Sequence, residues 1–307
     1  MIRSASHTRR SVRDELAAAG IISADAEASR IVAEVCGVEL ARLPLAPELS
    51  DEQLARVAEI TARRVAHEPL QYILGWVGFR RLTLDVGAGV FVPRPETEVL
   101  VSTAVEALAD DERAWMPAEL RQPRAIAVDL CAGSGAIALA LGDECAGLLV
   151  YAVEREPAAF AWLQRNLDKH RDQLAARGSE VIPVLADATN DPLPNLHGRV
   201  GLVTCNPPYI PDGCVPRDRS VAEYDPASAL YGGTDGLDVV RGVCGTAAAL
   251  LRPGGVLVME HGDLQGGGEG ANDPGVPGVV RGSGWFADIR DLPDLSGRPR
   301  VTVARRR

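Results

Sequence analysis

The sequence predicts an α/β fold with a doubly wound, mostly parallel sheet, preceded by a small N-terminal helical bundle and a β-hairpin linker. From residue 125 onward, apolar runs of strand length alternate with helical stretches, which is the pattern of a parallel sheet covered on both faces. Residues 7–68 instead show helical periodicity with short links. Between these two regions, alternating apolar residues are broken by glycines, as in a hairpin.

The N-terminal domain, residues 1–74, is expected to contain three helices. The first ends at Gly20, the second runs from a Ser23 cap to Gly37, and the third starts at Ser50 with acidic residues in its first turn. Serine and acidic side chains satisfy the free N–H groups at a helix start, and glycine favours a helix end. Nothing in this bundle indicates catalysis, so we interpret it as a domain that supports folding or docks a partner protein.

Residues 75–92 form the predicted linker hairpin, and the α/β catalytic domain spans residues 93–307. Its first helix is expected to open at Pro95, because proline and a following glutamate suit a first helical turn. The predicted strands are 125–130, 147–154, 181–187, 200–205, 255–261 and 300–306, with helices at 157–170 and 236–251. The segment 266–278 is rich in glycine and proline, so we interpret it as a loop.

The composition is that of an ordinary globular protein, with 307 residues, 46% hydrophobic residues and a net charge of −10. No apolar run reaches the ~18 residues that span a bilayer, and the charged N-terminus lacks the apolar stretch of a signal peptide. We therefore expect a cytoplasmic protein with no membrane partner, and we treat it as a monomer. The six cysteines are scattered without a C-x-x-C pair, which indicates reduced thiols and no metal site.

A glycine turn follows the first predicted strand, within VDLCAGSGAIALAL at residues 128–141. Gly133 and Gly135 permit a tight turn and a close approach of a ligand to the backbone. The same stretch matches the dinucleotide pattern G-x-G-x-x-A, and Glu154 follows at the spacing of a ribose-binding carboxylate. The motif alone fits both a nicotinamide-dependent oxidoreductase and an S-adenosylmethionine (AdoMet) enzyme, because both cofactors carry an adenosine.

Three features favour AdoMet. Asp129 precedes the glycines at the strand end, where its charge would repel a pyrophosphate but attract the cationic methionine part of AdoMet. Asp187 ends the third predicted strand and offers a polar partner for an adenine edge. The fourth strand ends in Asn206-Pro-Pro-Tyr, at the edge where open α/β sheets bind ligands. A glycine turn that serves only strand-to-helix packing is the structural alternative.

The stretch from Asn206 to Tyr209 suits the binding of a planar NH₂ group. Prolines end the strand and fix the backbone, so Pro208 stiffens the loop. The Asn206 side-chain oxygen and the Pro207 carbonyl can each accept one N–H, and the Tyr209 ring can stack on a flat substrate. This arrangement favours in-line methyl transfer by positioning, without a strong general base. A rigid loop with a buried tyrosine is the alternative interpretation.

Five segments together resemble the release factor glutamine methyltransferases (PrmC, also called HemK). They lie in the family's order from about residue 50 to the C-terminus and read EPLQYILG, FVPRPETE, VDLCAGSGAIALAL, NPPYIPD and LVMEHGDLQG. The resemblance implies a class I AdoMet-dependent methyltransferase fold, with AdoMet as cofactor and no metal. It also implies N5-methylation of the glutamine in the Gly-Gly-Gln motif of bacterial class 1 peptide chain release factors.

By matching positions, the resemblance places the target amide on residues 206–209 and the cofactor contacts at Cys131, Ala132, Gly133, Ser134, Gly135, Glu154, Ala188 and Asn206. Ala188 is smaller than the residue that many relatives carry beside the adenine, so its contact is expected from the backbone. Arg94, in a Pro-x-Pro segment, either lines the channel for the glutamine loop or serves as a charge at a helix start. Prolines and glycines at 274–278 interrupt the helix that the family has there.

Other substrates stay open at this point. Glutamine methylation of a ribosomal protein uses the same chemistry, and so does N6-adenine or N4-cytosine methylation of nucleic acid, where N-P-P-Y also occurs. The nucleic-acid alternative needs a positive track for phosphates, which the net charge of −10 disfavours. A non-enzymatic AdoMet-sensing protein is the alternative from a different functional class.

Overall fold

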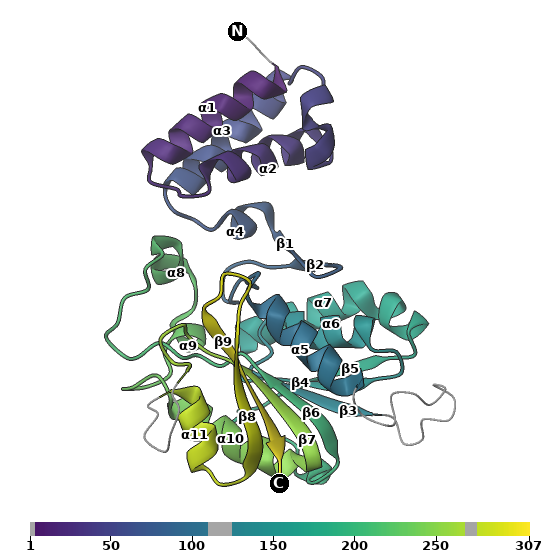
Figure 1. Cartoon of the computed structure of the whole chain (residues 1–307). Coiled ribbons are helices and arrows are strands. Elements are labelled where there is room, and N and C mark those ends of the chain that lie inside the picture. Colours follow the sequence, from purple (N-terminus) through teal and green to yellow (C-terminus); the bar gives the residue numbers. More distant parts are fainter. Residues whose placement is uncertain (1–3, 110–124, 268–274) are drawn as a thin grey trace. The chain divides into compact units, whose positions relative to one another are not determined.

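The computed structural model describes residues 4–109, 125–267 and 275–307. The chain forms two compact units (Figure 1). The first unit contains Met1–Gly75 together with Pro216–Tyr224, and the second contains Trp76–Val215 together with Asp225–Arg307. The predicted catalytic range 93–307 therefore includes a short segment that groups with the N-terminal helices.

The first unit is helical, and its elements are α1 (Ala5–Ala18), α2 (Ala24–Cys36), η1 (Leu40–Leu45), α3 (Asp51–Val65) and α4 (Leu70–Leu74). Ser50 and Gln53 form a capping box at the start of α3, and Gly37 ends α2 in the left-handed region at φ 65°. Leu16 and Ile31 are fully buried in the core of this unit. The three predicted helices are present, whereas η1 and α4 are too short to show a periodic pattern.

A short helix from the middle of the sequence, α8 (Arg219–Tyr224), belongs to this helical unit. The guanidinium of the buried Arg64 in α3 pairs with the Glu27 carboxylate at 2.5 Å and donates to the Ser220 hydroxyl at 3.1 Å. Burying an arginine without partners is strongly unfavourable, so this side chain needs both acceptors. Arg64 therefore fastens α8 to the bundle.

The second unit is a seven-stranded sheet with the strand order β5-β4-β3-β6-β7-β9-β8. Strands β3 to β7 are parallel, and β9 pairs antiparallel with both β7 and β8. The strands are β3 (Ile126–Leu130), β4 (Leu149–Glu154), β5 (Glu180–Leu185), β6 (Val200–Cys205), β7 (Leu251–Glu260), β8 (Phe286–Pro293) and β9 (Pro299–Arg306). The helices are α5 (Thr97–Ala109), α6 (Ala136–Glu144), α7 (Pro157–Ala176), α9 (Ala227–Leu230), α10 (Asp238–Leu250) and α11 (Val276–Gly282), with a 3₁₀ turn η4 (Pro194–Leu196).

Apolar layers on the two faces of the sheet hold this unit together. One layer joins the strands to α5, α6 and α7, and includes Ala127, Val150, Leu100, Leu139 and Leu163. The other layer joins the opposite strand faces to α10 and α11, and includes Val128, Leu257, Val243 and Val280. Because the strands are buried on both faces, they read as continuous apolar runs. The predicted α/β fold with a doubly wound, mostly parallel sheet is confirmed.

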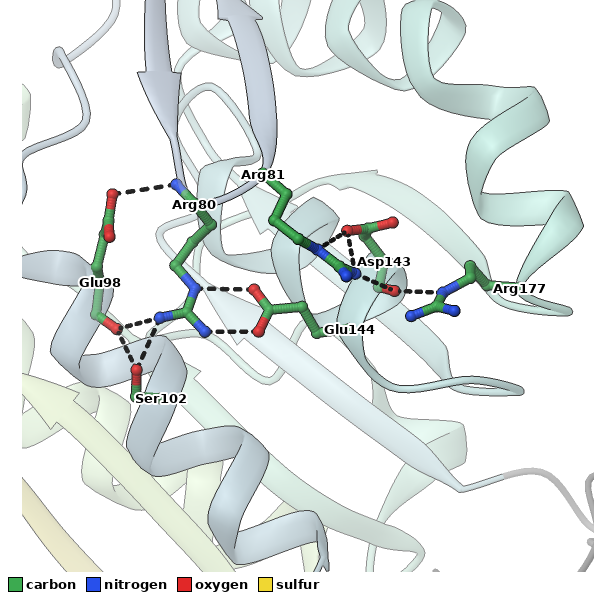
Figure 2. Close-up of polar contacts among 7 residues, drawn as sticks. All are labelled: Arg80, Arg81, Glu98, Ser102, Asp143, Glu144 and Arg177. Atoms are coloured by element: carbon green, nitrogen blue, oxygen red, sulfur yellow. Dashed lines mark hydrogen bonds and ion pairs between the residues drawn. The ribbon is translucent and has the colours of Figure 1, made fainter.

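The hairpin of β1 (Trp76–Phe79) and β2 (Leu82–Asp85) is fastened to this unit by two arginines (Figure 2). The Arg80 guanidinium binds both oxygens of Glu144, at 2.8 and 2.5 Å, and donates to the Ser102 hydroxyl at 2.7 Å. Arg81 pairs with Asp143 at 2.6 Å. The acidic partners lie at the end of α6 and Ser102 lies in α5, so the hairpin is anchored to the helices that cover one sheet face.

Two elements near the C-terminus were not predicted. Strand β8 is an edge strand with a bulge, where Asp288 has φ 51°, and its exposed positions leave no apolar run. The predicted loop at 266–278 is wrong at its end, because α11 begins at Val276. Pro277 stands in the first turn of this helix, where its missing N–H leaves no hydrogen bond unmade. Residues 268–274 of the predicted loop lie outside the described residues.

Candidate active site

Four parallel strands bring chemically important residues to one edge of the sheet. The strand register pairs Leu130 with Val153 and with Cys205, and pairs Cys205 with Met259. The residues that follow these positions are therefore neighbours at the carboxyl ends of the strands: Cys131, Glu154, Asn206 and Glu260. The chain order reverses at β3, since its neighbours β4 and β6 extend the sheet in opposite directions. Such a switch point is where open α/β sheets bind ligands.

The glycine loop between β3 and α6 has left-handed backbone at every second residue, at Cys131 (φ 61°), Gly133 (φ 56°) and Gly135 (φ 85°). A side chain at Gly133 would meet no atom of the described chain within 4 Å, so the backbone there faces open space. A side chain at Gly135 would come within 2.5 Å of Leu163, so this glycine permits close packing between α6 and α7. The backbone of the buried Ser134 accepts a hydrogen bond from Asn166 at 3.0 Å.

Glu154 holds the glycine loop in place. Its carboxylate oxygens accept the N–H groups of Gly133 and of Glu156, both at 2.8 Å, and the residue is only 7% exposed. A second bond, from the Ala132 N–H to the Val153 carbonyl at 2.9 Å, fastens the loop to β4. A carboxylate offers about four acceptor positions, so Glu154 retains capacity for two further donors.

Asp129 is fully buried beneath the loop and carries an orphaned oxygen. Its Oδ1 accepts the Thr204 hydroxyl at 2.9 Å, whereas Oδ2 has no hydrogen-bond partner in the described part of the chain. Burial raises the pKa of Asp129 to about 7, the charge of Glu154 acts in the same direction, and the Thr204 hydroxyl and Ala138 N–H oppose it. A buried carboxyl with a free oxygen is unfavourable in a purely structural setting and fits a ligand donor.

Asp187 and Ala188 follow β5, next to the end of β4. The Asp187 carboxylate accepts the N–H and the hydroxyl of Thr189, at 2.8 and 2.7 Å, and these two bonds lower its pKa. β5 ends at Leu185, two residues before the predicted end of the strand, so Asp187 belongs to a turn. Ala188 is buried.

The loop after β6 leaves two acceptors free. Asn206 donates through Nδ2 to the Thr97 hydroxyl at 3.4 Å, but its Oδ1 accepts no hydrogen bond from the described residues, and neither does the Pro207 carbonyl. The loop itself is rigidly held, because Pro207 and Pro208 are buried and the Tyr209 carbonyl accepts the Gln265 side-chain amide at 2.8 Å. The backbone that carries both free acceptors, the Asn206 Oδ1 and the Pro207 carbonyl, is therefore fixed in position.

Tyr209 lies among charged side chains at this edge. Burial raises the pKa of its hydroxyl to about 12; Glu260 and Glu96 add to the rise, while Arg300 and Arg94 oppose it. The ring lies against Gly262, where an added Cβ would stand 3.5 Å from a ring carbon. The neutral ring is thus positioned by packing.

Arg94 is already paired in this structure. Its guanidinium binds the fully buried Asp225 carboxylate at 2.7 Å and lies 4.9 Å from the centre of the Phe91 ring. These contacts hold Arg94 close to Tyr209, whose pKa it influences.

Two buried residues beside Asn206, Thr97 and Glu260, are not predicted from the sequence. Glu260 ends β7 and is 2% exposed, and its Oε2 has no hydrogen-bond partner in the described ranges. Burial raises the pKa of Glu260 to about 7, against the lowering influence of Thr97 and Arg300. The sequence signal for Glu260 is an acidic residue directly after an apolar run, the same signal that marks Glu154.

The described residues contain no group of three or more His, Cys, Asp or Glu side chains placed to hold a metal ion. None of their helices is long and apolar enough to cross a membrane.

The two raised pKa values predict that the ligand-free protein loses stability between pH 5 and pH 7. Asp129 and Glu260 keep a proton to about pH 7 when folded, but lose it near pH 4 when unfolded. Their stabilising contribution is therefore complete below pH 4 and declines as the pH rises to about 7, by about 1 kcal/mol per pH unit for each group. Urea unfolding at pH 5, 6 and 7 measures this slope. Asp129→Asn and Glu260→Gln should each flatten it, and unchanged slopes in both variants would contradict the assignment.

Known proteins are similar in sequence to this chain along nearly its whole length. The family model described as "PrmC N-terminal domain" matches residues 7–75. The chain is 43% identical over 295 residues to a protein of Streptomyces coelicolor named release factor glutamine methyltransferase, covering 95% of this chain and 94% of that protein. A protein of the same name from Mycobacterium tuberculosis is 37% identical over 296 residues, covering 95% of this chain and 88% of the relative.

One relative bears a different name. A 4-amino-L-phenylalanine/4-methylamino-L-phenylalanine methyltransferase from Streptomyces pristinaespiralis is 37% identical over 231 residues, covering 75% of this chain and 71% of the relative. Both compounds in that name carry a nitrogen on an aromatic ring.

Proposed function

The chain belongs to the release factor glutamine methyltransferase family, and from that premise we propose that it methylates the side-chain amide nitrogen (N5) of the glutamine in the Gly-Gly-Gln motif of bacterial class 1 peptide chain release factors. The observation that carries the proposal is the pair of free acceptors, Asn206 Oδ1 and the Pro207 carbonyl, at the carboxyl edge of the sheet. A carboxamide nitrogen has two N–H donors, so one fixed acceptor for each matches it.

The residues around the glycine loop fit AdoMet. Glu154 retains acceptor capacity for the two ribose hydroxyls, the orphaned Asp129 oxygen suits the cationic amino group, and the open space at Gly133 admits a ligand against the backbone. The remaining proposed cofactor contacts are Cys131, Ala132, Ser134, Gly135, Asp187, Ala188 and Asn206. When bound, AdoMet supplies an electrophilic methyl group on a positively charged sulfur.

The protein's contribution is to position a weak nucleophile. An amide nitrogen shares its lone pair with the carbonyl, and two acceptors on its N–H groups return electron density to the nitrogen and fix its direction. Asn206 and Pro207 supply these acceptors without reorganisation, because the following Pro208 and the Gln265 bond hold the loop. No strong base is needed, because the proton is acidic once the nitrogen carries a fourth substituent.

Neighbouring side chains complete the acceptor pocket. The Tyr209 ring stacks against the flat carboxamide, and Arg94 forms part of the wall through its fixed pair with Asp225. Residues 1–74 dock the release factor, 75–92 connect the two parts, and 93–307 carry the chemistry. The proposal includes a cytoplasmic monomer that acts without metal, membrane or nucleic acid.

A labelling experiment tests the proposal. The protein is incubated with radiolabelled AdoMet and, separately, with class 1 release factors, ribosomal proteins, a nucleic-acid pool and 4-aminophenylalanine. We expect label on the release factor alone, recovered as N5-methylglutamine after digestion. Label on the ribosomal proteins or nucleic acid without the release factor would refute the proposal.

The aromatic amine provides a second candidate function, since one relative is named for such a substrate. Placing a loop glutamine about 3 Å from a buried methyl donor needs binding energy from remote contacts. An intact release factor should therefore exceed both a Gly-Gly-Gln peptide and 4-aminophenylalanine in kcat/KM by about 10²-fold or more. Equal values for the amino acid and the release factor would favour the small-molecule function.

A further inference from the structure

The acceptor loop (residues 206–212) is held by a glutamine from another loop. Gln265, between β7 and α11, donates through its side-chain nitrogen to the Tyr209 carbonyl at 2.8 Å. Its side-chain oxygen accepts the Gly262 N–H at 3.1 Å, so both ends of the amide are engaged and only one orientation satisfies both. The Gln265 carbonyl accepts the Val276 N–H, at the start of α11, at 2.7 Å. Gln265 therefore joins the acceptor loop to an anchored segment.

A glycine turn at residues 232–236 also contacts the acceptor loop. The Ile210 N–H donates to the Leu230 carbonyl at 2.8 Å, and the Gly232 N–H donates to the Ile210 carbonyl at 2.9 Å. The Tyr209 carbonyl and the Ile210 N–H belong to one peptide group. The glutamine bond therefore fastens the oxygen of this peptide, and the bond to Leu230 fastens its nitrogen.

The absence of side chains lets the glycine turn lie directly against the acceptor loop. A Cβ added at Gly232 would stand 2.5 Å from the Pro208 carbonyl oxygen. A Cβ added at Gly236 would stand 2.3 Å from the Tyr209 carbonyl oxygen and 3.0 Å from the Gln265 side-chain nitrogen. The shortest of these distances are far below van der Waals contact, so a side chain at either glycine must push the loop or the turn aside. The turn and the glutamine therefore meet at one oxygen, that of Tyr209.

The position of the fastened peptide controls the Pro207 carbonyl. Pro208 and Tyr209 connect the two groups. The ring of Pro208 fixes its φ at about −65°. Pro207 and Pro208 are also buried, so the connection has little freedom to absorb a shift. A misplacement of about 1 Å can lower the rate of a reaction about 10²-fold. A shift of the fastened peptide is therefore expected to reach the Pro207 carbonyl and to slow methyl transfer.

We propose that Gln265 and Gly236 are positioning residues that together set the place of the Pro207 carbonyl. The inference rests on the proposed function, in which this carbonyl accepts one N–H of the substrate amide. Neither residue lies in the glycine loop after β3 or at Glu154, so replacing them should change the rate of transfer and leave AdoMet affinity unchanged. The loop after β7 and the glycine turn thus act on the chemistry through the acceptor loop.

Amide hydrogen exchange tests these contacts without any substrate. The Ile210 amide is protected by its bond to the Leu230 carbonyl, and the Gly232 amide by its bond to the Ile210 carbonyl. Gln265→Met keeps the length of the side chain but removes its donor, so both amides should exchange about tenfold faster than in the wild-type protein. The amides of β3 are the internal reference and should be unchanged. Equal exchange of the Ile210 amide in the variant and the wild type would overturn the proposal.

Kinetics with two alanine variants separates positioning from stability. Gly236 and Gly254 have nearly the same left-handed backbone, with φ 76° and 77°, so alanine introduces a similar strain at both. Gly254 lies toward the start of β7, and a Cβ there would meet no described atom within 4 Å. In single turnovers of the release factor with excess enzyme, Gly236→Ala should lower the rate constant about tenfold or more. Gly254→Ala should keep the wild-type rate constant, and AdoMet affinity should be unchanged in both variants.

A purely structural role would have a different signature. Loss of folded protein lowers the amplitude of the single turnover, which counts active molecules, and leaves the rate constant unchanged. Equal rate constants in Gly236→Ala and Gly254→Ala would therefore contradict the proposal. Gln265→Met adds no backbone strain and should lower the rate constant about tenfold, so it decides the question if Gly236→Ala does not fold. Faster amide exchange in Gln265→Met with a wild-type rate constant would also refute the positioning role.

These measurements separate the inference from the function on which it rests. If the wild-type protein labels no release factor, the proposed substrate is wrong, yet amide exchange still reports whether Gln265 holds the acceptor loop. If the release factor is labelled and Gln265→Met matches the wild-type rate constant, the function stands and the positioning role fails.

Discussion

Replacing Asn206 by alanine is expected to lower kcat for release factor methylation by about 10²–10³-fold, the usual effect of removing one preorganised partner at a reacting group. The alanine variant should lose one proposed cofactor contact but keep at least part of its AdoMet affinity, because Glu154, Asp129 and the glycine loop are untouched. Its fold should survive as well, since the loop remains held by the buried prolines and by the Gln265 bond to the Tyr209 carbonyl. Single-turnover rates, calorimetric AdoMet affinity and melting temperature measure the three quantities separately.

The matched control is Asn206→Asp, which keeps an acceptor oxygen at the same place. It should retain more activity than the alanine variant, and its added negative charge near the sulfonium should leave AdoMet binding equal or tighter. A residue that only stabilised the loop would behave differently, with activity and melting temperature falling together in both variants. Near-normal single-turnover methylation by Asn206→Ala would rule out the assigned role.

The fold class is predictable from the sequence because its main elements are marked locally. Strands such as β3 and β6 are buried on both faces, so they appear as continuous apolar runs. Strand β8 has no such run, because it lies at an edge and a bulge at Asp288 breaks its alternation. The association of α8 with the bundle also escapes prediction, since it depends on the contact of Arg64 with a residue more than a hundred positions away.

The residues of the candidate site also fall into two groups: those that the sequence locates, and those that only the fold brings together. Glu154 and Asn206 can be located from sequence, because each directly follows an apolar run next to a recognisable motif. Thr97 resembles an ordinary helix start and Glu260 an ordinary strand end. Only the fold brings them to Asn206, through the packing of α5 against β6 and through the register of β6 and β7. Asp187 also follows an apolar run and can be located from the sequence, but its two hydrogen bonds from Thr189 depend on the turn that the chain forms after β5.

Replacing Glu154 by alanine is expected to weaken AdoMet binding at least tenfold and up to about 10⁴-fold. Two charge-assisted hydrogen bonds to the ribose hydroxyls would be lost, each contributing roughly 1.5–3 kcal/mol. The structure adds a second cause, because the same carboxylate holds the N–H groups of Gly133 and Glu156. Calorimetry with S-adenosylhomocysteine measures the combined effect. The matched control is Glu156→Ala, which removes the same charge two residues away but leaves the backbone N–H in place.

A cofactor analogue separates the two causes. Wild-type protein should bind the 2′-deoxy analogue of S-adenosylhomocysteine about tenfold more weakly than the parent compound, because one hydrogen bond to Glu154 is missing. Glu154→Ala should bind both compounds equally, since the partner of that hydroxyl is gone, whereas Glu156→Ala should discriminate like wild type. If Glu154→Ala still distinguishes the two ligands, the carboxylate acts only by holding the glycine loop. Tight NADH binding by the wild-type protein would instead restore the dinucleotide interpretation of that loop.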